Sequence, residues 1–189
     1  MRKLIYSINL TMDGCCDHTK FSGDDEMLSL FSRHLRNAGL LVYGRVTYEL
    51  MVPFWPDMAR THSGHTAAAN EFARVFDSMD KVVFSRTLER VEDHKSRLVR
   101  TSPADEIRKL KRVEGKSILL GGVSLPTELM ETGLIDEYFF VIHPVIAGEG
   151  RRLFADAKLK EKLQLKLVGS DTLPSGCVTL RYAAGGHQV

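Results

Sequence analysis

Short apolar runs alternate with amphipathic stretches along the first three quarters of the chain. The runs at residues 40–43 and 81–84 are almost continuously apolar, which is typical of parallel strands buried on both faces. Turn-forming or polar residues follow each run, so the runs end sharply. The pattern predicts strands at residues 4–10, 40–43, 81–84, 98–99, 117–120 and 136–143.

The stretches between these strands carry apolar residues at helical spacing. Asp24, Asp25 and Glu26 open the first helix, because acidic side chains suit the positive end of the helix dipole. Gly39 is expected to close that helix as a C-cap. The Phe-Trp-Pro sequence after Pro53 is expected to form a rigid corner. Further helices are predicted over 46–52, 66–76 and 104–113, and from the end of the 117–120 strand to about residue 132.

The pattern changes near the C-terminus. Leu163, Leu165 and Leu167 alternate with other residues, which indicates an antiparallel strand. A Pro-Ser-Gly turn at 174–176 and an apolar run at 177–182 complete a hairpin, and the tail from Ala183 is expected to fray. The predicted fold class is therefore α/β, a single domain over 1–189, with a mostly parallel central sheet, helices on both faces and an antiparallel C-terminal hairpin.

Composition narrows the function classes. The 189 residues have a net charge of +2, so no basic field favours nucleic acid or a membrane surface. The first residues do not resemble a signal peptide, and we expect a cytoplasmic protein. Cys15, Cys16 and Cys177 are expected to be free thiols, with a redox role for the adjacent pair as the alternative. His62 and His65 lack a cysteine or acid at metal-like spacing, so no metal site is predicted.

Three strand ends carry residues suited to an anion. They are Gly44-Arg45-Val46-Thr47, Ser85-Arg86-Thr87-Leu88 and Gly121-Gly122-Val123-Ser124-Leu125. Glycine lets the backbone approach a ligand, arginine forms charge-assisted bonds to phosphate, and helix starts favour negative charge. Ligands of open α/β sheets bind beyond the carboxyl ends of the strands. The set therefore indicates a phosphorylated cofactor.

Each of these signals has a simpler interpretation. Gly44-Arg45 could be a plain strand-to-helix turn, and Arg86 could be a solvated surface residue. Gly121-Gly122 does not match the G-x-G-x-x-G pattern of ordinary dinucleotide folds. The hypothesis depends on the three segments together.

These segments belong to a wider set of motifs. The set extends the three segments to residues 43–49 (YGRVTYE), 82–88 (VVFSRTL) and 120–125 (LGGVSL). It also includes residues 7–14 (SINLTMDG), 134–138 (LIDEY) and 144–150 (PVIAGEG). With these motifs the chain resembles the dihydrofolate-reductase superfamily, and most closely its bacterial riboflavin-reductase branch. The resemblance covers residues 4–181.

The resemblance implies a three-layer sandwich, NADPH as cofactor and a homodimer. It implies reduction of a small heterocycle of the 5-amino-6-(5-phosphoribosylamino)uracil type by direct hydride transfer. The cofactor residues that it implies are Gly44, Arg45, Thr47, Ser85, Arg86, Thr87, Gly121, Gly122, Val123, Ser124 and Leu125. The substrate would lie beside the first strand and its turn, against Asn9, Thr11 and Trp55, although Trp55 could equally be a packing residue.

The alignment with folate reductases is least well defined at the position of the catalytic acid. Glu26 falls near the position of the acid in folate reductases, and Asp13 is the second candidate. Glu26 could instead belong only to the helix start, and Asp13 only to a turn. A dihydrofolate or pterin reductase and a non-catalytic nucleotide-binding module remain as alternative functions. The zinc-deaminase motifs of the bifunctional riboflavin enzymes, H-x-E and P-C-x-x-C, do not occur.

Overall fold

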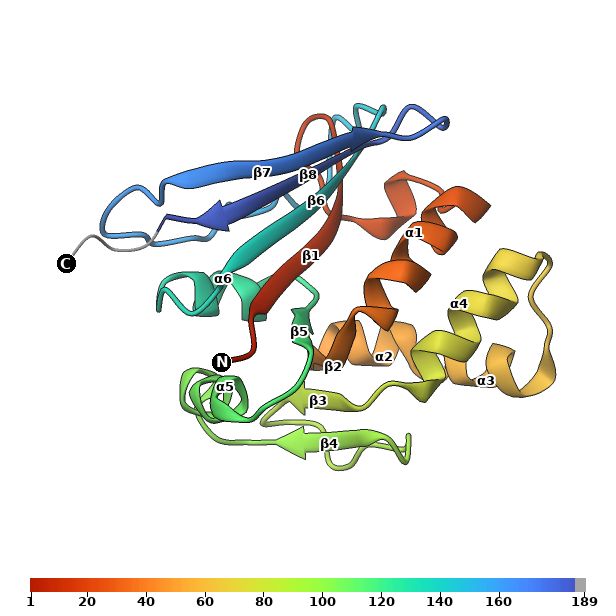
Figure 1. The fold of residues 1–189 in the computed structure, drawn as a ribbon, viewed down its shortest axis with the longest axis horizontal. Coiled ribbons are helices and arrows are strands. Elements are labelled where there is room, and N and C mark those ends of the chain that lie inside the picture. Colours follow the sequence, from red (N-terminus) through yellow and green to blue (C-terminus); the bar gives the residue numbers. More distant parts are fainter. Residues whose placement is uncertain (186–189) are drawn as a thin grey trace.

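The computed structural model describes residues 1–185, and its eight strands form one sheet (Figure 1). Across the sheet the order is β4-β3-β2-β5-β1-β6-β8-β7. The strands are β1 (Leu4–Thr11), β2 (Ala38–Gly44), β3 (Lys81–Phe84), β4 (Ser96–Val99), β5 (Ser117–Leu120), β6 (Glu137–His143), β7 (Leu165–Thr172) and β8 (Val178–Ala184).

All strand pairings from β4 to β6 are parallel, whereas β8 is antiparallel to both of its neighbours. The last two strands thus form the predicted antiparallel hairpin, with β8 next to β6 and β7 at the edge. Because β1, β2, β3 and β5 run in the same direction, their carboxyl ends meet at one edge of the sheet. This edge carries the three motifs that the sequence singled out.

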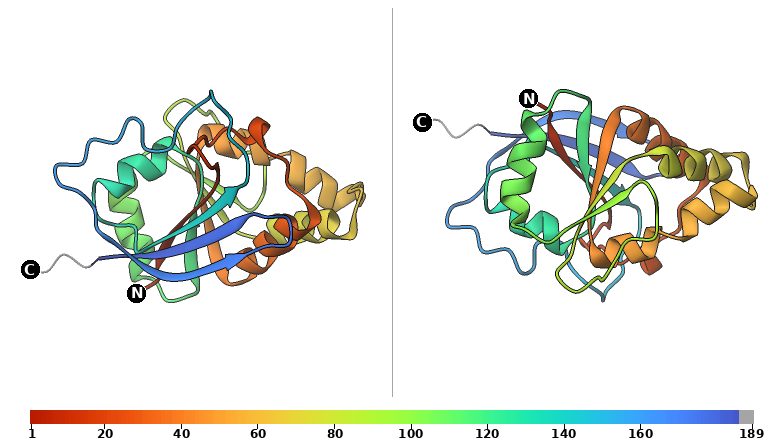
Figure 2. Two further views of the ribbon diagram at one scale, coloured as in Figure 1. Left: turned by 90° about the horizontal axis from the view of Figure 1, so that it is seen from above. Right: turned by 90° about the horizontal axis from the view of Figure 1, so that it is seen from below.

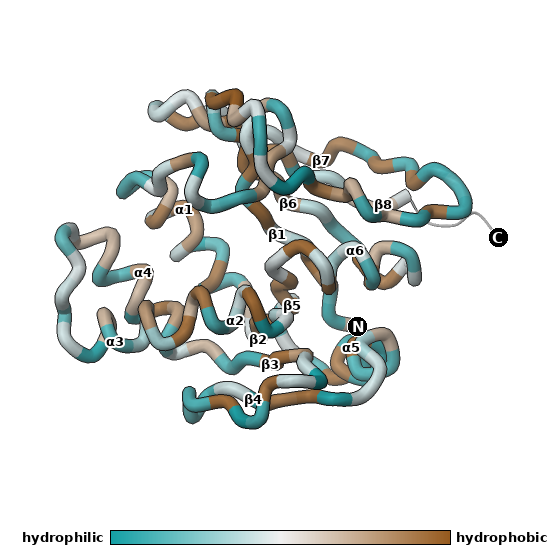
Figure 3. The backbone as a smooth tube through the Cα atoms, turned by 180° about the vertical axis from the view of Figure 1, so that it is seen from behind, coloured by the Kyte–Doolittle hydropathy of each residue, from teal (hydrophilic) through white to brown (hydrophobic). Residues whose placement is uncertain are grey.

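Helices cover both faces of the sheet (Figures 1 and 2). One buried cluster joins Leu35, Tyr48 and Phe76 of one helical layer to the sheet, and the other joins Ile107 and Leu129 to the opposite face. Stretches of β1 and β5 are among the most hydrophobic parts of the backbone in Figure 3. The helices are α1 (Asp25–Arg36), α2 (Arg45–Met51), α3 (Phe54–Thr61) and α4 (Ala67–Ser78) on the first face, and α5 (Pro103–Arg112) and α6 (Ser124–Met130) on the second. The predicted three-layer α/β architecture is confirmed.

Two local predictions were wrong. Helix α1 ends at Arg36, and Gly39 lies inside β2, where a Cβ would approach Arg2 Nη2 at 3.2 Å and Lys116 Cβ at 3.3 Å. The glycine thus permits close packing and does not cap the helix. The Phe-Trp-Pro segment forms the first turn of α3 and not a corner. Proline is tolerated there because first-turn N–H groups have no partner within a helix.

The C-terminal elements are longer than predicted. Strand β7 extends to Thr172, and β8 continues through Ala183, which pairs with Glu137 of β6. Ala183 is therefore strand and not frayed tail, because β6 and β7 satisfy the backbone on both sides. Residues 186–189 of the predicted tail lie outside the described residues. None of the helices within residues 1–185 combines the length and the apolar character needed to cross a bilayer.

Candidate functional site

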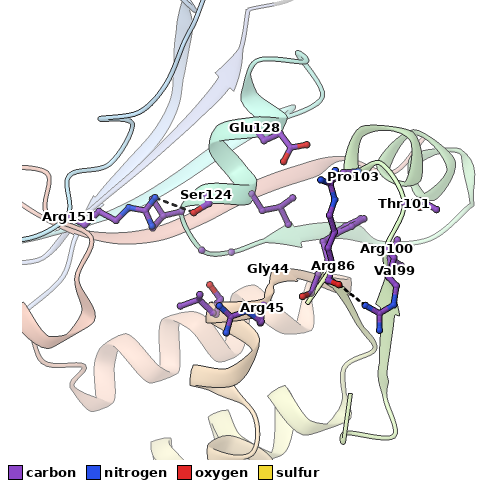
Figure 4. A pocket seen from close by; sticks show the side chains of 18 residues that line it. Gly44, Arg45, Arg86, Val99, Arg100, Thr101, Pro103, Ser124, Glu128 and Arg151 are labelled. Atoms are coloured by element: carbon purple, nitrogen blue, oxygen red, sulfur yellow. Dashed lines mark hydrogen bonds between the residues drawn. The ribbon is translucent and has the colours of Figure 1, made fainter. Parts of the chain in front are cut away.

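A cavity of about 460 Å³ opens at the carboxyl ends of β2, β3, β4 and β5 (Figure 4). We call it the arginine cavity, because the side chains of Arg45, Arg86, Arg100 and Arg151 line it. Every predicted cofactor residue except Thr87 also lines it. The three separate motifs therefore converge on one opening, as the sequence predicted.

The arginines hold different positions around this opening. Arg45 Nη1 lies 2.8 Å from Glu49 Oε2 on the next turn of α2. Arg100 donates to the carbonyl oxygens of Arg86 (3.2 Å) and Leu88 (2.7 Å), which fixes the loop after β3. Among the described residues the lining holds four arginines and one acidic residue, Glu128. The cavity is therefore suited to a ligand with several negative charges.

The glycine pair at the end of β5 permits a close approach of the backbone. A Cβ on Gly121 would lie 2.6 Å from Tyr43 Cε1. A Cβ on Gly122 would lie 2.5 Å from Thr47 Oγ1, and Gly122 has a φ of +94°. The Tyr6 hydroxyl donates to the Gly122 carbonyl at 2.8 Å. Only glycine fits both positions, and Tyr6 holds the turn from below.

Ser85 and Thr87 have separate roles in the loop after β3. Ser85 Oγ accepts from the backbone N–H groups of Leu88 (2.9 Å) and Thr87 (3.2 Å), so it shapes the turn that presents Arg86. Thr87 lies outside the arginine cavity, in a neighbouring depression that Arg45 also lines.

A second cavity, of about 560 Å³, lies between α1 and the sheet. We call it the ring cavity, because its walls are largely aromatic and aliphatic. Asn9 and Trp55, two of the residues expected beside the substrate, line it, and Trp55 also packs edge-on against Phe72. The two cavities share six lining residues, which form their junction: Val46, Thr47, Gly121, Gly122, Val123 and Arg151.

One wall of the ring cavity carries a chain of polar groups. His143 Nε2 lies 3.3 Å from Asn9 Oδ1, and His143 Nδ1 lies 3.5 Å from Cys177 Sγ. The imidazole stacks on Phe21 with ring centroids 4.3 Å apart. Burial lowers the pKa of His143, so the ring is neutral near pH 7. We assign the hydrogen on Nε2 and a thiol hydrogen toward Nδ1, because this orders every polar group in the chain.

Two further polar atoms in this cavity have no partner among the described residues. Ser7 Oγ and His34 Nε2 are both buried and unpaired, and both residues line the ring cavity. Burial, together with the nearby positive charge of Arg181, lowers the pKa of His34 to about 4. Buried polar atoms are rarely left unpaired in folded proteins. Their hydrogen-bonding capacity is therefore unused among the described residues.

The two predicted acids and Thr11 lie outside both cavities. Glu26 Oε2 accepts from the backbone N–H of Ser175 in the β7–β8 turn at 3.1 Å. Asp13 accepts from the Thr11 hydroxyl and from the N–H groups of Ala147 and Gly148, and these bonds hold its pKa below the ordinary value. Both carboxylates thus make structural contacts. Asp13 ties the loop after β1 to the loop after β6, which carries Arg151.

Several lining residues were missed by the sequence interpretation. Arg100 follows β4, and the run Arg-Thr-Ser after that weak strand was the available signal. Arg151, Asp17, His34 and His143 carried no local signal, because they reach the cavities from segments far apart in the chain. Within residues 1–185, no group of three His, Cys, Asp or Glu side chains could hold a metal ion.

The chain is similar to known proteins both in sequence and in structure. The uncharacterized protein YyaP of Bacillus subtilis is 31% identical over 189 residues, covering 98% of this chain and 96% of YyaP. A putative riboflavin biosynthesis protein from Shewanella sp. PV-4 has a similar structure, with a TM-score of 0.69 and 20% identity over 97% of this chain and 99% of that one.

A deaminase/5-amino-6-(5-phosphoribosylamino)uracil reductase from Thermotoga maritima has a TM-score of 0.65 and 16% identity. The match covers 97% of this chain and 57% of the Thermotoga chain. At these identities the two solved structures establish the fold. The model of the RibD C-terminal domain matches residues 2–179, so this chain belongs to the RibD C-terminal domain family, a family of reductase-like proteins.

Proposed function

We propose that the protein is an NADPH-dependent reductase that transfers hydride to a small heterocyclic ring, of the kind found in 5-amino-6-(5-phosphoribosylamino)uracil. The observation that carries the proposal is the junction between the two cavities. There Thr47 and Gly122 border both the arginine cavity and the ring cavity. A cofactor with an anionic body and a redox ring, seated in the first cavity, would reach a ring in the second.

The residues of the arginine cavity fit NADPH. The glycine pair leaves room that any Cβ would fill, and Arg45, Arg86 and Arg151 supply positive charge. The Arg86 side chain is exposed and projects from the loop after β3, which suits the 2′-phosphate. When bound, NADPH would supply the hydride. The chain would align the two rings and exclude water from between them.

The ring cavity would hold the acceptor. Asn9 can donate from its amide nitrogen, because its Oδ1 accepts from His143. Ser7 and His34 offer further polar atoms at the same wall. These groups would orient the ring, and the aromatic walls would stack on its faces.

Turnover assays test the proposal. Loss of NADPH absorbance is followed with the ribosylamino-uracil compound, with dihydrofolate and without a substrate. Oxidation that depends on the uracil-type ring supports the proposal. Turnover of dihydrofolate alone would favour the folate or pterin reductase, and tight NADPH binding with no turnover of any ring would favour a non-catalytic module.

The homodimer implied by the family resemblance is part of the proposal. Strand β7 forms one edge of the sheet, and Leu167 and Val168 on it are each 50% exposed. An exposed edge strand with apolar side chains is a common site of association. Light scattering of the purified protein tests for a dimer.

A further inference from the structure

The charged side chains are divided unequally between the two cavities. The arginine cavity is lined by four arginines. Within residues 1–185, the larger ring cavity has one, Arg151, which lies at the junction. Resting on the proposed function and narrowing its substrate class, we propose that the ring cavity takes an uncharged aromatic ring compound that carries no phosphate group.

Arg151 is directed toward the cofactor side. Its Nη2 donates to Ser124 Oγ at 3.2 Å and lies 3.8 Å from Asp156 Oδ2. Ser124 lines only the arginine cavity of the two, and Figure 4 shows the Arg151 side chain reaching toward it. One donor of this arginine is therefore already bound on the cofactor side.

The buried histidines of the ring cavity do not supply the positive charge that a phosphate would need. His34 and His143 are neutral near pH 7, because burial lowers the pKa of each. His18 lies at the exposed rim, with its Nδ1 3.9 Å from the Asp17 carboxylate. A buried phosphate without a cation would cost several kcal/mol of desolvation.

Within the described part of the chain, a longer substrate would not place its phosphate beside a free cation at the rim either. A phosphate on a chain that reached the rim would meet the carboxylate of Asp17, which also lines the cavity. That carboxylate is ionised, because hydrogen bonds from the Thr19 N–H and hydroxyl lower its pKa. The Asp17 carboxylate therefore disfavours a phosphate placed directly beside it.

The remaining surface suits the body and edge of a neutral ring. Leu28, Phe31, Leu50, Met51 and Trp55 supply apolar walls. The Asn9 amide, Ser7 Oγ and His34 Nε2 supply uncharged hydrogen-bonding groups. This combination of apolar walls with few polar contacts is typical of sites for uncharged small molecules.

The single tryptophan of the chain makes the test direct. Trp55 lines the ring cavity, so quenching of its fluorescence reports a bound ring. Riboflavin and FMN serve as probes, because they share one ring and one side chain and differ only in a phosphate. Saturating NADP⁺ is present throughout, so that FMN cannot occupy the arginine cavity. The variant Trp55→Phe provides the blank.

We expect riboflavin to bind more tightly than FMN by roughly tenfold or more. Equal or tighter binding of FMN overturns the proposal, and so does the absence of quenching by either probe. Leu50→Lys places an ammonium group at the rim, since Leu50 is 45% exposed. This variant should shift the ratio of FMN affinity to riboflavin affinity several-fold toward FMN; an unchanged ratio contradicts the role of charge.

The outcome is separable from that of the proposed function. NADPH affinity is measured on its own, by nicotinamide fluorescence with no ring compound present. Failure to bind NADPH would contradict the reductase proposal. Because Trp55 lines the ring cavity and not the arginine cavity, its quenching by riboflavin and by FMN would still decide the ring preference.

Discussion

Thr47 and Gly122 lie so close at the junction of the two cavities that a Cβ on Gly122 would stand 2.5 Å from Thr47 Oγ1. The two residues come from α2 and from the end of β5, and their contact defines how the cavities join. The width of this passage depends on the missing side chain of Gly122. Substitutions here test whether the passage is used.

Gly122→Ala is expected to weaken NADPH binding by about tenfold or more, because the methyl group displaces Thr47 and fills the passage. Thermal unfolding and NADPH fluorescence titration measure stability and affinity separately. Gly133→Ala is the matched control, since Gly133 also has a positive φ (+68°) but no atom lies within 4 Å of the added Cβ. It should lose stability and keep NADPH affinity. Equal affinity loss in both variants would contradict a local effect.

Arg86→Ala is expected to weaken NADPH by roughly 10- to 100-fold, the size of hydrogen bonds to a charged group, and to leave NADH nearly unchanged. The motivation is the place of Arg86 at the arginine cavity. Competitive titration of both coenzymes measures the change. Arg90→Ala serves as control, because Arg90 is 83% exposed on the same loop and outside that cavity. Parallel losses for NADPH and NADH would remove Arg86 from the 2′-phosphate.

Glu26→Gln is expected to keep the turnover rate. The carboxylate lies outside both cavities and accepts from the Ser175 N–H, which an amide oxygen can also do. The turnover rate is measured by steady-state kinetics with the ring compound that is turned over in the assays described above. A decrease of about 100-fold, the size of a lost general acid, would make Glu26 the proton donor despite its position.

Lys81→Met is expected to lower the free energy of unfolding by about 3–5 kcal/mol, because it leaves the Asp93 charge buried without its partner. The two side chains are 0% and 3% exposed, with Nζ 3.0 Å from Oδ2. Urea unfolding measures the loss. Adding Asp93→Asn should restore part of it. Arg108→Ala breaks an exposed pair with Asp105 and should cost under about 0.5 kcal/mol.

His34 is expected to make stability depend on pH. Its pKa is about 4 in the folded chain and has its ordinary value near 6.5 in the unfolded chain, so the unfolded chain binds more protons between these values. The contribution of His34 to the free energy of unfolding is complete above pH 6.5. It decreases by about 3 kcal/mol as the pH drops toward 4. His34→Phe keeps the stacking on Phe139 and should remove this loss. Urea unfolding across this range, with exposed His65→Phe as control, decides it.

Much of the site could be predicted because its chemistry lies at strand ends. The segments Gly44–Thr47, Ser85–Arg86 and Gly121–Leu125 each follow a short apolar run, and parallel strands bring such ends to one edge of a sheet. The C-cap expected at Gly39 was wrong for the converse reason. A glycine stands there because Arg2 and Lys116, which are distant in sequence, leave no room for a side chain.

Local sequence patterns were enough to predict the strands, most of the helices, the terminal hairpin and the cationic motifs, because hydrophobic periodicity and turn residues act locally; α3 was missed. The packing of the chain was needed to show that Arg151, His34 and His143 meet at two joined cavities, and that Asp13 and Glu26 make structural bonds. Those relationships depend on the direction of side chains from segments up to 149 residues apart. No local pattern of residues encodes that direction.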